Sequence, residues 1–419
     1  MIRLAGVRAG GDAAHMRSAK AVTALFLGAA LAACSTAADE TRQMARALPP
    51  DASFTHPGVL VNGAQLDTAR ENVHAGKQPW LRAYLDMRDS EYGSYKYRPQ
   101  PYESVDCPGG DQPNRPAHGC VEERQDAIAA YTQALLFRVT GKPAHAVKAR
   151  EIMDAWSGKI RRHTEDDAGL QTAWAGSTWA RAAEIVRHTP GAGWPADRVR
   201  RFEDMLRNAY LPVVSREVPD YNGNWDLAMT DAAIGIGVFT NDHKVFDRAL
   251  SRFRARVPAY FYLEKDGKVP IAPARSGLDD PAKLTTYWFG QTTFKDGVSQ
   301  ETCRNFKHAG YSLAAASHIA ETAWHQGVDL YGEAKDRLKA AAELHARYQE
   351  GEKAPAWLCG GKVDRSLGPD LEVLVNHLEG RLDEPVPAAH RLVERHRPAG
   401  TDDLFVAWET LTHARNPGV

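Results

Sequence analysis

The sequence predicts an all-α protein folded as an (α/α) toroid, an incomplete barrel of antiparallel helical hairpins. Two observations support this prediction: at least eight segments carry apolar residues at helical spacing, and mostly short loops join them. Strand patterns are scarce. In a toroid, inner helices surround a cavity and outer helices cover them. An α-solenoid is the alternative, but the sequence has no fixed repeat period.

The helices are expected to follow a segment rich in aromatic residues and turns, which extends to Val121 and wraps the surface. Gly and Pro end several of the helical patterns, as at Gly141 and Pro190. No linker composition separates two domains, so residues 51–419 are expected to form one toroid. The expected helices span residues 122–140, 144–156, 170–188, 196–214, 226–239, 243–260, about 306–324, 331–350, 371–382 and 403–413.

Residues 1–34 are predicted to be a bacterial lipoprotein signal peptide. A short basic start precedes an apolar run of 13 residues, 21–33, which is too short to span a bilayer. Small residues then precede Cys34, which is expected to be lipidated and to become the mature N-terminus. Residues 35–50 would form a polar tether, and the protein would be exported to the periplasm or outer membrane. A plain secretory signal with a chance Cys is the alternative.

Charge and cysteine usage narrow the function classes. The formal net charge of −1 gives no overall signal for nucleic acid or an anionic membrane, so a polyanion would need a local basic pocket. Cys107 and Cys120 flank a Pro/Gly-rich loop and would pair in an oxidising compartment. Cys303 and Cys359 are either free or a second pair. Cysteine spacing does not suggest a structural zinc site.

The helix from about Phe306 carries a polar stripe without a charged outer face. If the helix begins by Arg304, then Arg304, His308 and Tyr311 lie on one face at i, i+4 and i+7. No Lys, Glu, Asp or Arg occurs between His308 and Ala320. The stripe therefore indicates either an acid–base set that lines an enclosed polar space or hydrogen-bonded core groups.

Three further groups are candidates for substrate contacts. Asn222, Asn224 and Trp225 precede or open a helix, where a side-chain amide can donate to a carboxylate. The alternative for this turn is a plain helix cap by Asp226. The aromatic loop with Trp288 and Gln291 fits either a sugar-stacking wall or core packing. His377, on a late helix, is by itself better explained as a hydrogen-bonded core histidine.

Three runs of sequence are distinctive: NWDLAMTDAAIGIGVFTND (224–242), FKDGVSQETCRNFKHAGYSLAAASHIAETAWHQGVDLYGE (294–333) and WETLTHA (408–414). They resemble the alginate lyase superfamily of polysaccharide lyases, above all its secreted alginate and glucuronan lyase branch. The resemblance covers most of residues 120–414. It implies an (α/α) toroid and a lyase that needs neither a metal nor an organic cofactor.

The resemblance also implies site residues. Asn224 matches the Asn of the family's Asn-His pair, and Arg304 with Tyr311 matches an Arg and a Tyr seven residues apart. Trp225 stands where the family has its His, so His308 or His377 would have to replace that residue. The expected catalytic residues are Tyr311, His308, Arg304 and Asn224. The expected substrate-binding residues are Trp225, Asn222, Trp288, Gln291, Gln300, Glu301, His377 and Trp174.

The predicted function is β-elimination on a 4-linked polyuronate, alginate or β-1,4-glucuronan. Asn224 and Arg304 would neutralise the C6 carboxylate, while Tyr311 or a His removes the C5 proton and Tyr311 protonates the leaving O4. The partner is expected to be an acidic polysaccharide and the protein a monomer that meets the membrane only through its lipid. Two alternatives remain: a non-catalytic glycan-binding lipoprotein, and a glycoside hydrolase with two carboxylic acids drawn from Asp226, Asp231, Asp296 and Glu301.

Overall fold

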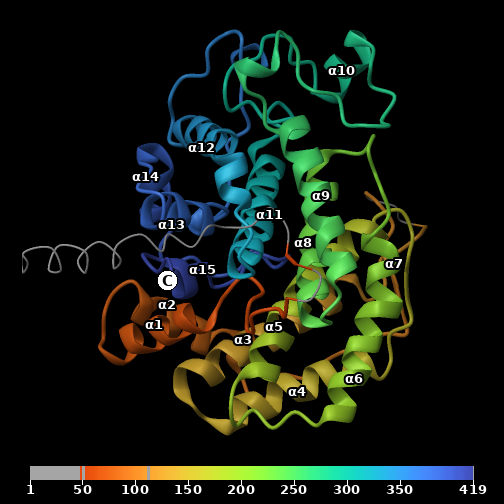
Figure 1. The fold of residues 1–419 in the computed structure, drawn as a ribbon, viewed down its shortest axis with the longest axis vertical. Helices are drawn as coiled ribbons and strands as arrows, with labels where there is room; N and C mark the ends of the chain where they lie inside the picture. The colour runs from red at the N-terminus through yellow and green to blue at the C-terminus, as the bar shows by residue number, and fades with distance from the viewer. Residues whose placement is uncertain (1–47, 50–51, 111–113, 419) are drawn as a thin grey trace, which may run out of the picture. The chain divides into compact units, whose positions relative to one another are not determined.

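A row of inner helices, each followed by an outer helix that runs back over it, forms most of the protein (Figure 1). The computed structural model describes residues 48–49, 52–110 and 114–418. Neighbouring inner helices contact one another in chain order: α3 (Cys120–Thr140), α5 (Ala168–His188), α8 (Gly223–Phe239), α11 (Phe306–His325) and α13 (Glu372–Gly380). This arrangement confirms the predicted (α/α) toroid.

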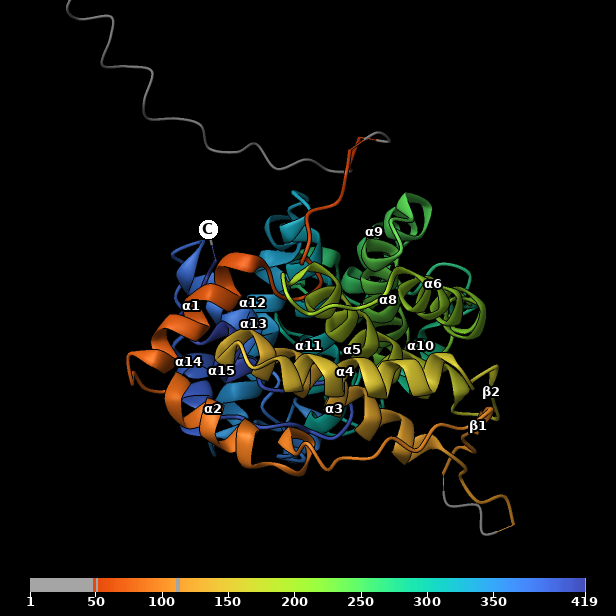
Figure 2. The same ribbon diagram turned by 90° about the horizontal axis from the view of Figure 1, so that it is seen from below.

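The outer helices cover the row from outside, as Figure 2 shows for α4 against α3 and α5. The second of them, α6, runs through a π-helical turn at Leu206–Tyr210 into the short α7 (Leu211–Val214), so the expected helix 196–214 is one continuous helical segment. The outer helices are α4 (Pro143–Ser157), α6 (Ala196–Met205), α9 (His243–Tyr260), α12 (Leu330–Gln349) and α14 (Pro387–His396).

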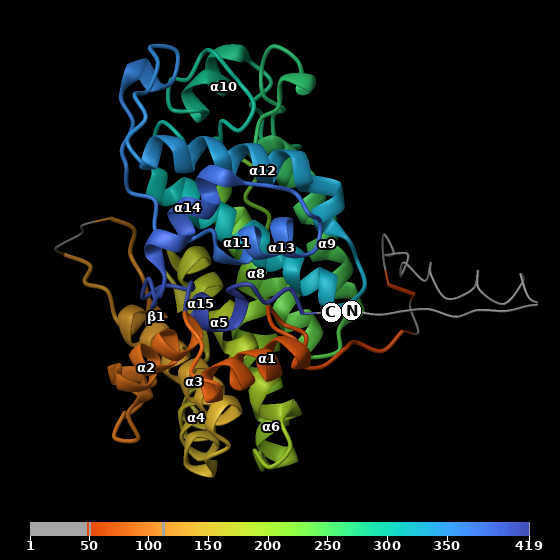
Figure 3. The same ribbon diagram turned by 90° about the vertical axis from the view of Figure 1, so that its left-hand side faces the viewer.

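Three helices join the two ends of the row. The short α15 (Glu409–His413) contacts α13, α1 (Gly63–His74) and α2 (Trp80–Asp89), and α1 in turn contacts α3 (Figure 3). The amide of Asn416 donates to the backbone oxygen of Gln65 at 2.9 Å. The region that the sequence assigned to surface turns therefore contains two helices. A capping box of Asn62 and Gln65 at the start of α1 is the signal that would have revealed the first of them.

The remaining elements are short. Two three-residue strands, β1 (Ser104–Asp106) and β2 (Arg162–Thr164), pair in parallel, and α10 (Pro281–Tyr287) lies in the loop region between α9 and α11. Within the described residues, three 3₁₀ turns occur, at Glu91–Gly93, Glu264–Asp266 and Cys359–Gly361.

The last helix is shorter than the expected 403–413. The carboxylate of Asp402 accepts the backbone N–H groups of Leu404, Phe405 and Val406 at 2.9–3.0 Å, which removes donors that a helix would use. Trp408 then adopts a left-handed backbone conformation (φ 60°), and α15 begins directly after it.

The inner helices are buried almost all round, which explains their Ala- and Gly-rich sequences. Along α11 the residues from Ala309 to Ala323 are all buried. The charged residues in this core are paired: His318 lies 2.7 Å from Glu409, and Arg181 lies 2.6 Å from Asp231 and 2.8 Å from His318. His318 is therefore a hydrogen-bonded core group.

No helix within the described ranges is long and apolar enough to cross a membrane. The predicted signal peptide with Cys34, and all of the predicted tether except residues 48–49, lie outside the described residues.

Candidate active site

Glu301 is the centre of a buried hydrogen-bonded group where the first turn of α8 meets the segment before α11. Its carboxylate accepts the side-chain amide of Asn224 at 2.7 and 2.8 Å, the hydroxyl of Tyr260 at 3.0 Å and a guanidinium N–H of Arg304 at 2.7 Å. Glu301 and Asn224 are buried, whereas the Arg304 side chain is 32% exposed. The carboxylate thus holds one buried amide and one partly exposed cation beside each other.

Gln300, the neighbour of Glu301, fixes the start of α8. Its side-chain oxygen accepts the backbone N–H of Gly223 at 3.0 Å, and its amide donates to Asn222 at 3.2 Å and to the Tyr287 carbonyl at 2.6 Å. A Cβ on Gly223 would lie 2.1 Å from the ring of Tyr260, so only glycine fits there. The fully buried Gln300 therefore positions the start of α8 rather than faces a ligand, and the half-buried Asn222 is bonded to it.

A disulfide between Cys303 and Cys359 holds the segment that carries Arg304 (Cα–Cα distance 5.2 Å). Gln291 is buried beside it, where its side-chain oxygen accepts the backbone N–H of Cys359 at 2.9 Å and its amide donates to the Trp357 carbonyl at 2.8 Å. Gln291 therefore supports the loop that carries Cys359 and does not contact substrate as predicted. Both cysteine pairs considered from the sequence are joined in the structure.

His308 and Tyr311 lie in the first turns of α11, just after Arg304. The helix begins at Phe306 with Asn305 as its N-cap, so Arg304 precedes the helix and is not part of its stripe as expected. The Asn305 side-chain oxygen accepts both the backbone N–H and Nδ1 of His308, at 3.0 and 2.6 Å. An oxygen that already caps the helix is an acceptor, so Nδ1 carries the proton and Nε2 keeps a free lone pair.

Tyr311 lies between aromatic rings from three elements. Ring centroids of Trp174, Phe405 and His308 are 6.4, 6.0 and 5.9 Å from its own. Its hydroxyl has no hydrogen-bond partner among the described residues, whereas the fully buried Tyr210, Tyr260 and Tyr331 each have one. The Tyr311 hydroxyl is therefore available to an incoming group.

Burial and nearby charges shift the pKa values of His308 and Tyr311. Burial, with the nearby cations Arg304 and Lys307, lowers the pKa of His308 to about 4, so the imidazole is neutral near neutral pH. Burial, with the carboxyl groups of Asp402 and Asp370, raises the pKa of the Tyr311 phenol above its ordinary value. The resting site thus holds a protonated phenol beside a neutral imidazole.

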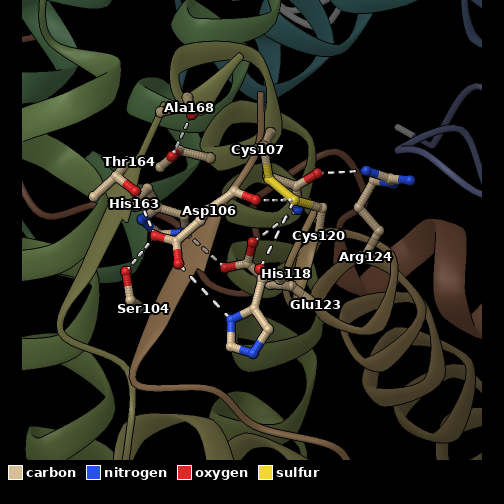
Figure 4. The surroundings of a disulfide bond; sticks show 12 residues. Ser104, Asp106, Cys107, His118, Cys120, Glu123, Arg124, His163, Thr164 and Ala168 are labelled. Atoms are coloured by element: carbon tan, nitrogen blue, oxygen red, sulfur yellow. Dashed lines mark hydrogen bonds and ion pairs between the residues drawn. A yellow bond between two sulfur atoms is a disulfide. The ribbon is translucent and has the colours of Figure 1, made fainter. Parts of the chain in front are cut away.

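Arg124 supplies a cation that the sequence did not single out. Its guanidinium lies 5.7 Å from the ring centroid of Trp174 and donates to Gln171. The disulfide between Cys107, directly after β1, and Cys120, the first residue of α3, fixes the helix start one turn before Arg124 (Figure 4). The sequence signal for Arg124 is weak, because it consists only of a basic residue at helical spacing from Cys120.

The exposed aromatic residues near Arg304 differ from those expected. Trp288 is fully buried and packs edge-on against Phe294, so its predicted contact with substrate is wrong. Its neighbour Phe289 adopts a positive φ of 54°, is 38% exposed and lies under the Arg304 guanidinium at 6.0 Å. The half-buried Trp225 packs edge-on against the exposed Tyr221, with centroids 5.2 Å apart.

His377 is not at this site. It is fully buried, stacks on Tyr331 at 3.5 Å and contacts the ion pair of Glu321 and Arg381 near the other end of α11. It therefore cannot replace the family's His, and of the two candidates only His308 lies beside Tyr311.

The carboxylates considered for a hydrolase are all engaged by protein groups. Asp226 pairs with Arg252 and Arg256, Asp231 pairs with Arg181, and Asp296 accepts the backbone N–H of Glu264. Glu301 is held by the three donors described above. The arrangement thus offers no opposed pair of free carboxylic acids among these four.

A cavity of about 260 Å³ lies on the outer side of α8 and α9, away from Tyr311. Its lining includes Arg252 and Arg256, both committed to Asp226 and to backbone carbonyls. We place the candidate site at Tyr311 because the free hydroxyl, free imidazole nitrogen and partly exposed guanidinium meet there, whereas the cavity's buried polar groups are already satisfied.

The chain is similar to known alginate lyases in sequence and fold. It matches the alginate lyase family over residues 95–355, and no curated protein matches it. Alginate lyase A1-III from Sphingomonas species A1 has 16% identity and a TM-score of 0.60, over 86% of this chain and 97% of that chain. A variant of A1-III complexed with a tetrasaccharide has 17% identity and a TM-score of 0.60, over 87% and 99%.

An alginate lyase from Bacteroides ovatus has 12% identity and a TM-score of 0.52, over 86% of this chain and 99% of that chain. These structural likenesses concern the fold, and the family match covers more than half of the sequence. The protein therefore belongs to the alginate lyase family and is a polysaccharide lyase.

Proposed function

We propose that the protein cleaves a 4-linked polyuronate, polymannuronate or β-1,4-glucuronan, by β-elimination that leaves an unsaturated uronate end. The observation that carries this proposal is the position of one partly exposed cation, Arg304, and one oriented amide, Asn224, on a shared buried carboxylate. A uronate has to lose the charge on its C6 carboxylate before its C5 proton becomes acidic enough to leave. Arg304 and Asn224 would supply that stabilisation as charge develops on the carboxylate oxygens.

In this mechanism His308 is the base and Tyr311 the acid. Nε2 of His308 takes the C5 proton, the C5–H electron pair forms the C4–C5 double bond, and the C4–O4 bond breaks as Tyr311 gives its proton to O4. The raised pKa of Tyr311 favours the protonated phenol that this step requires. A substrate carboxylate beside His308 would raise the imidazole's lowered pKa and so strengthen the base.

The one-sided placement of the two groups supports a choice among polyuronates. His308 and Tyr311 belong to the same turns of α11, and their ring centroids are 5.9 Å apart, too close to hold a sugar ring between them. They would therefore approach a sugar from one face. In β-D-mannuronate and β-D-glucuronate H5 and O4 lie on the same side, as this requires, whereas in α-L-guluronate they point in opposite directions.

Trp225, in place of the family's His, supports a binding role next to this pair. It packs against Tyr221 and against the first turn of α5, where a Cβ on Gly169 would lie 3.5 Å from its ring. Trp174, from the same helix, contacts Tyr311. Aromatic faces of this kind stack on sugar rings, so Trp225 and Trp174 would hold sugars beside the cleaved bond.

The test follows ultraviolet absorbance of the unsaturated product on polymannuronate, polyglucuronate, polyguluronate and a neutral glucan. We expect a rise on polymannuronate or polyglucuronate that falls by roughly 10²–10⁴-fold in both Tyr311→Phe and His308→Gln. Tyr348→Phe, at a buried tyrosine of α12, is the matched control and should leave the rate unchanged. A rise on polyguluronate alone, or one that survives Tyr311→Phe, would overturn the proposed chemistry.

We also propose that the protein is exported and anchored by a lipid on Cys34, and that it acts as a monomer. The first proposal rests on the apolar run that ends at Cys34, and Cys34→Ala should release the protein from the membrane fraction. Retention of the Cys34→Ala variant in membranes would contradict it. Sedimentation of the released protein at the mass of a dimer would contradict the second.

A further inference from the structure

Three side chains that the lyase chemistry does not use meet near the C-terminal end of α5. Glu184 and His188 are one helical turn apart and so project from the same face of α5, and His56 reaches them from the segment before α1. One ligand atom from each residue lies within 4.8 Å of the other two. Glu184 is ten residues beyond Trp174, about 15 Å along the helix axis, so this cluster is separate from the candidate active site.

The hydrogen bonds around His56 favour a positive charge between its ring and Glu184. Nε2 of His56 lies 3.2 Å from the side-chain oxygen of Asn241, to which it can only donate. Nδ1 lies 3.0 Å from both carboxylate oxygens of Glu184. A neutral imidazole would turn its lone pair toward the carboxylate, so either a proton or a metal ion has to occupy the space between them.

His188 provides a second imidazole nitrogen without a partner. Its Nε2 is buried, lies 3.6 Å from Glu184 and makes no hydrogen bond with any described residue. Its ring stacks on that of His56 with centroids 4.2 Å apart and an angle of 5°. No hydrogen bond from the described residues holds the His188 ring, so a turn about its Cβ–Cγ bond would disturb only this stacking contact and would aim the lone pair at an ion beside Glu184.

We propose that His56, Glu184 and His188 bind a zinc ion. Two imidazoles and one carboxylate are a usual ligand set for Zn²⁺, whereas Ca²⁺ and Mg²⁺ prefer oxygen ligands. The groups that would orient these ligands are present: Asn241 holds the far side of His56, and the backbone N–H of Gly58 donates to Glu184 at 3.0 Å. Water would complete a four-coordinate site, since both histidines are partly exposed.

The ion would have a structural role, because it would clamp the segment before α1 onto α5. That segment is otherwise attached mainly to α11: the backbone N–H groups of Thr55 and Leu60 donate to Gln326 at 2.8 Å and to Thr322 at 3.1 Å. Zinc would therefore link α5 and α11 through the segment that passes between them. Cysteine spacing gives no hint of such a site, because its ligands are two histidines and a glutamate, and His56 lies 128 residues before Glu184.

The test measures zinc binding to the full chain without an affinity tag, after removal of metal with a chelator. We expect one zinc per chain and, at zinc about 100-fold above the Kd, a rise in Tm of roughly 3 °C. His188→Ala should weaken binding at least about tenfold and abolish the rise in Tm. This variant should fold, since His188 makes no hydrogen bond, and His74→Ala, at an exposed histidine of α1, is the matched control.

Lyase activity measured in parallel should be the same with and without zinc, so failure here would be distinct from failure of the proposed lyase mechanism. Absence of zinc binding at micromolar concentrations would overturn the site and leave a proton between His56 and Glu184. Equal binding in the wild type and in His188→Ala would also overturn it, because the ion would then be held elsewhere.

Discussion

Replacement of Glu301 by Gln tests whether this buried carboxylate orients the substrate-binding groups. Gln keeps the shape and one acceptor, but it removes the charge shared by Asn224, Tyr260 and Arg304. A hydrogen bond to a charged group contributes about 1 kcal/mol more than a neutral one, so three weakened bonds predict a loss of about 3 kcal/mol in the free energy of unfolding.

The same change should act on catalysis through Arg304 and Asn224. Without its counter-charge, the partly exposed Arg304 side chain is no longer held in one orientation, and neither is the Asn224 amide. A displacement of about 1 Å in such groups costs on the order of 100-fold, so kcat/KM per folded molecule should fall by about that factor. The assay combines urea unfolding with the initial rise in ultraviolet absorbance on the best polyuronate.

Glu372→Gln is the matched control. Glu372 is also buried, and it is bound by Arg397 at 3.1 Å and by Thr410 at 3.2 Å, in contacts that involve none of the candidate site residues. It should lose similar stability and keep the wild-type kcat/KM. If Glu301→Gln loses stability but also keeps the wild-type kcat/KM, Glu301 is only a core group and the reasoning about orientation is refuted.

Three further predictions concern stability. Burial raises the pKa of Asp402 from 3.8 to about 6, so ionisation of this carboxyl destabilises the fold as pH rises from about 4 to about 6. Asp402→Asn should therefore raise Tm near pH 7 and not near pH 4, and an equal change in Tm at the two pH values would contradict this. Chain entropy predicts that loss of the Cys303–Cys359 disulfide, which spans 56 residues, lowers the free energy of unfolding by about 4 kcal/mol, and that loss of the 13-residue Cys107–Cys120 pair lowers it by about 3 kcal/mol. Urea unfolding of the two Ser variants measures both losses, and the reverse order would contradict the prediction. His377→Asn should lower Tm but not kcat/KM, and a fall in kcat/KM would return His377 to the site.

The inner helices could be predicted from sequence because burial on all sides leaves a clear pattern. The stretch after His308 lacks charged residues over a length that only an enclosed helix explains. Helix α1 was missed because its apolar residues are few, whereas α2 (WLRAYLDMRD) carries an apolar pattern that was not recognised among the surrounding turns. In α1 the capping box at Asn62, rather than periodicity, marks the start.

The site was only partly predictable, because its geometry depends on contacts between distant segments. Asn224 and Glu301 are 77 residues apart in the chain, and no spacing rule shows that one holds the other. Phe289 rather than Trp288 is the exposed aromatic residue of its loop, and Phe289 has a positive φ that the sequence does not reveal. The sequence also does not show that the His308 side chain lies beside Tyr311 whereas the His377 side chain packs in the core.

The closure of the toroid by α15 has a consequence for how the chain folds. His413 and Asn416 bond to Leu60 and Gln65 across more than 350 residues, so the last contacts of the ring join its first helix to its last. Contacts of such long sequence separation form slowly, because the loop between them has to be ordered first. The helical pairs in the middle can assemble from local contacts, whereas the α1–α15 seam is expected to form last and to open first. Hydrogen exchange would detect it as the least protected junction between helices.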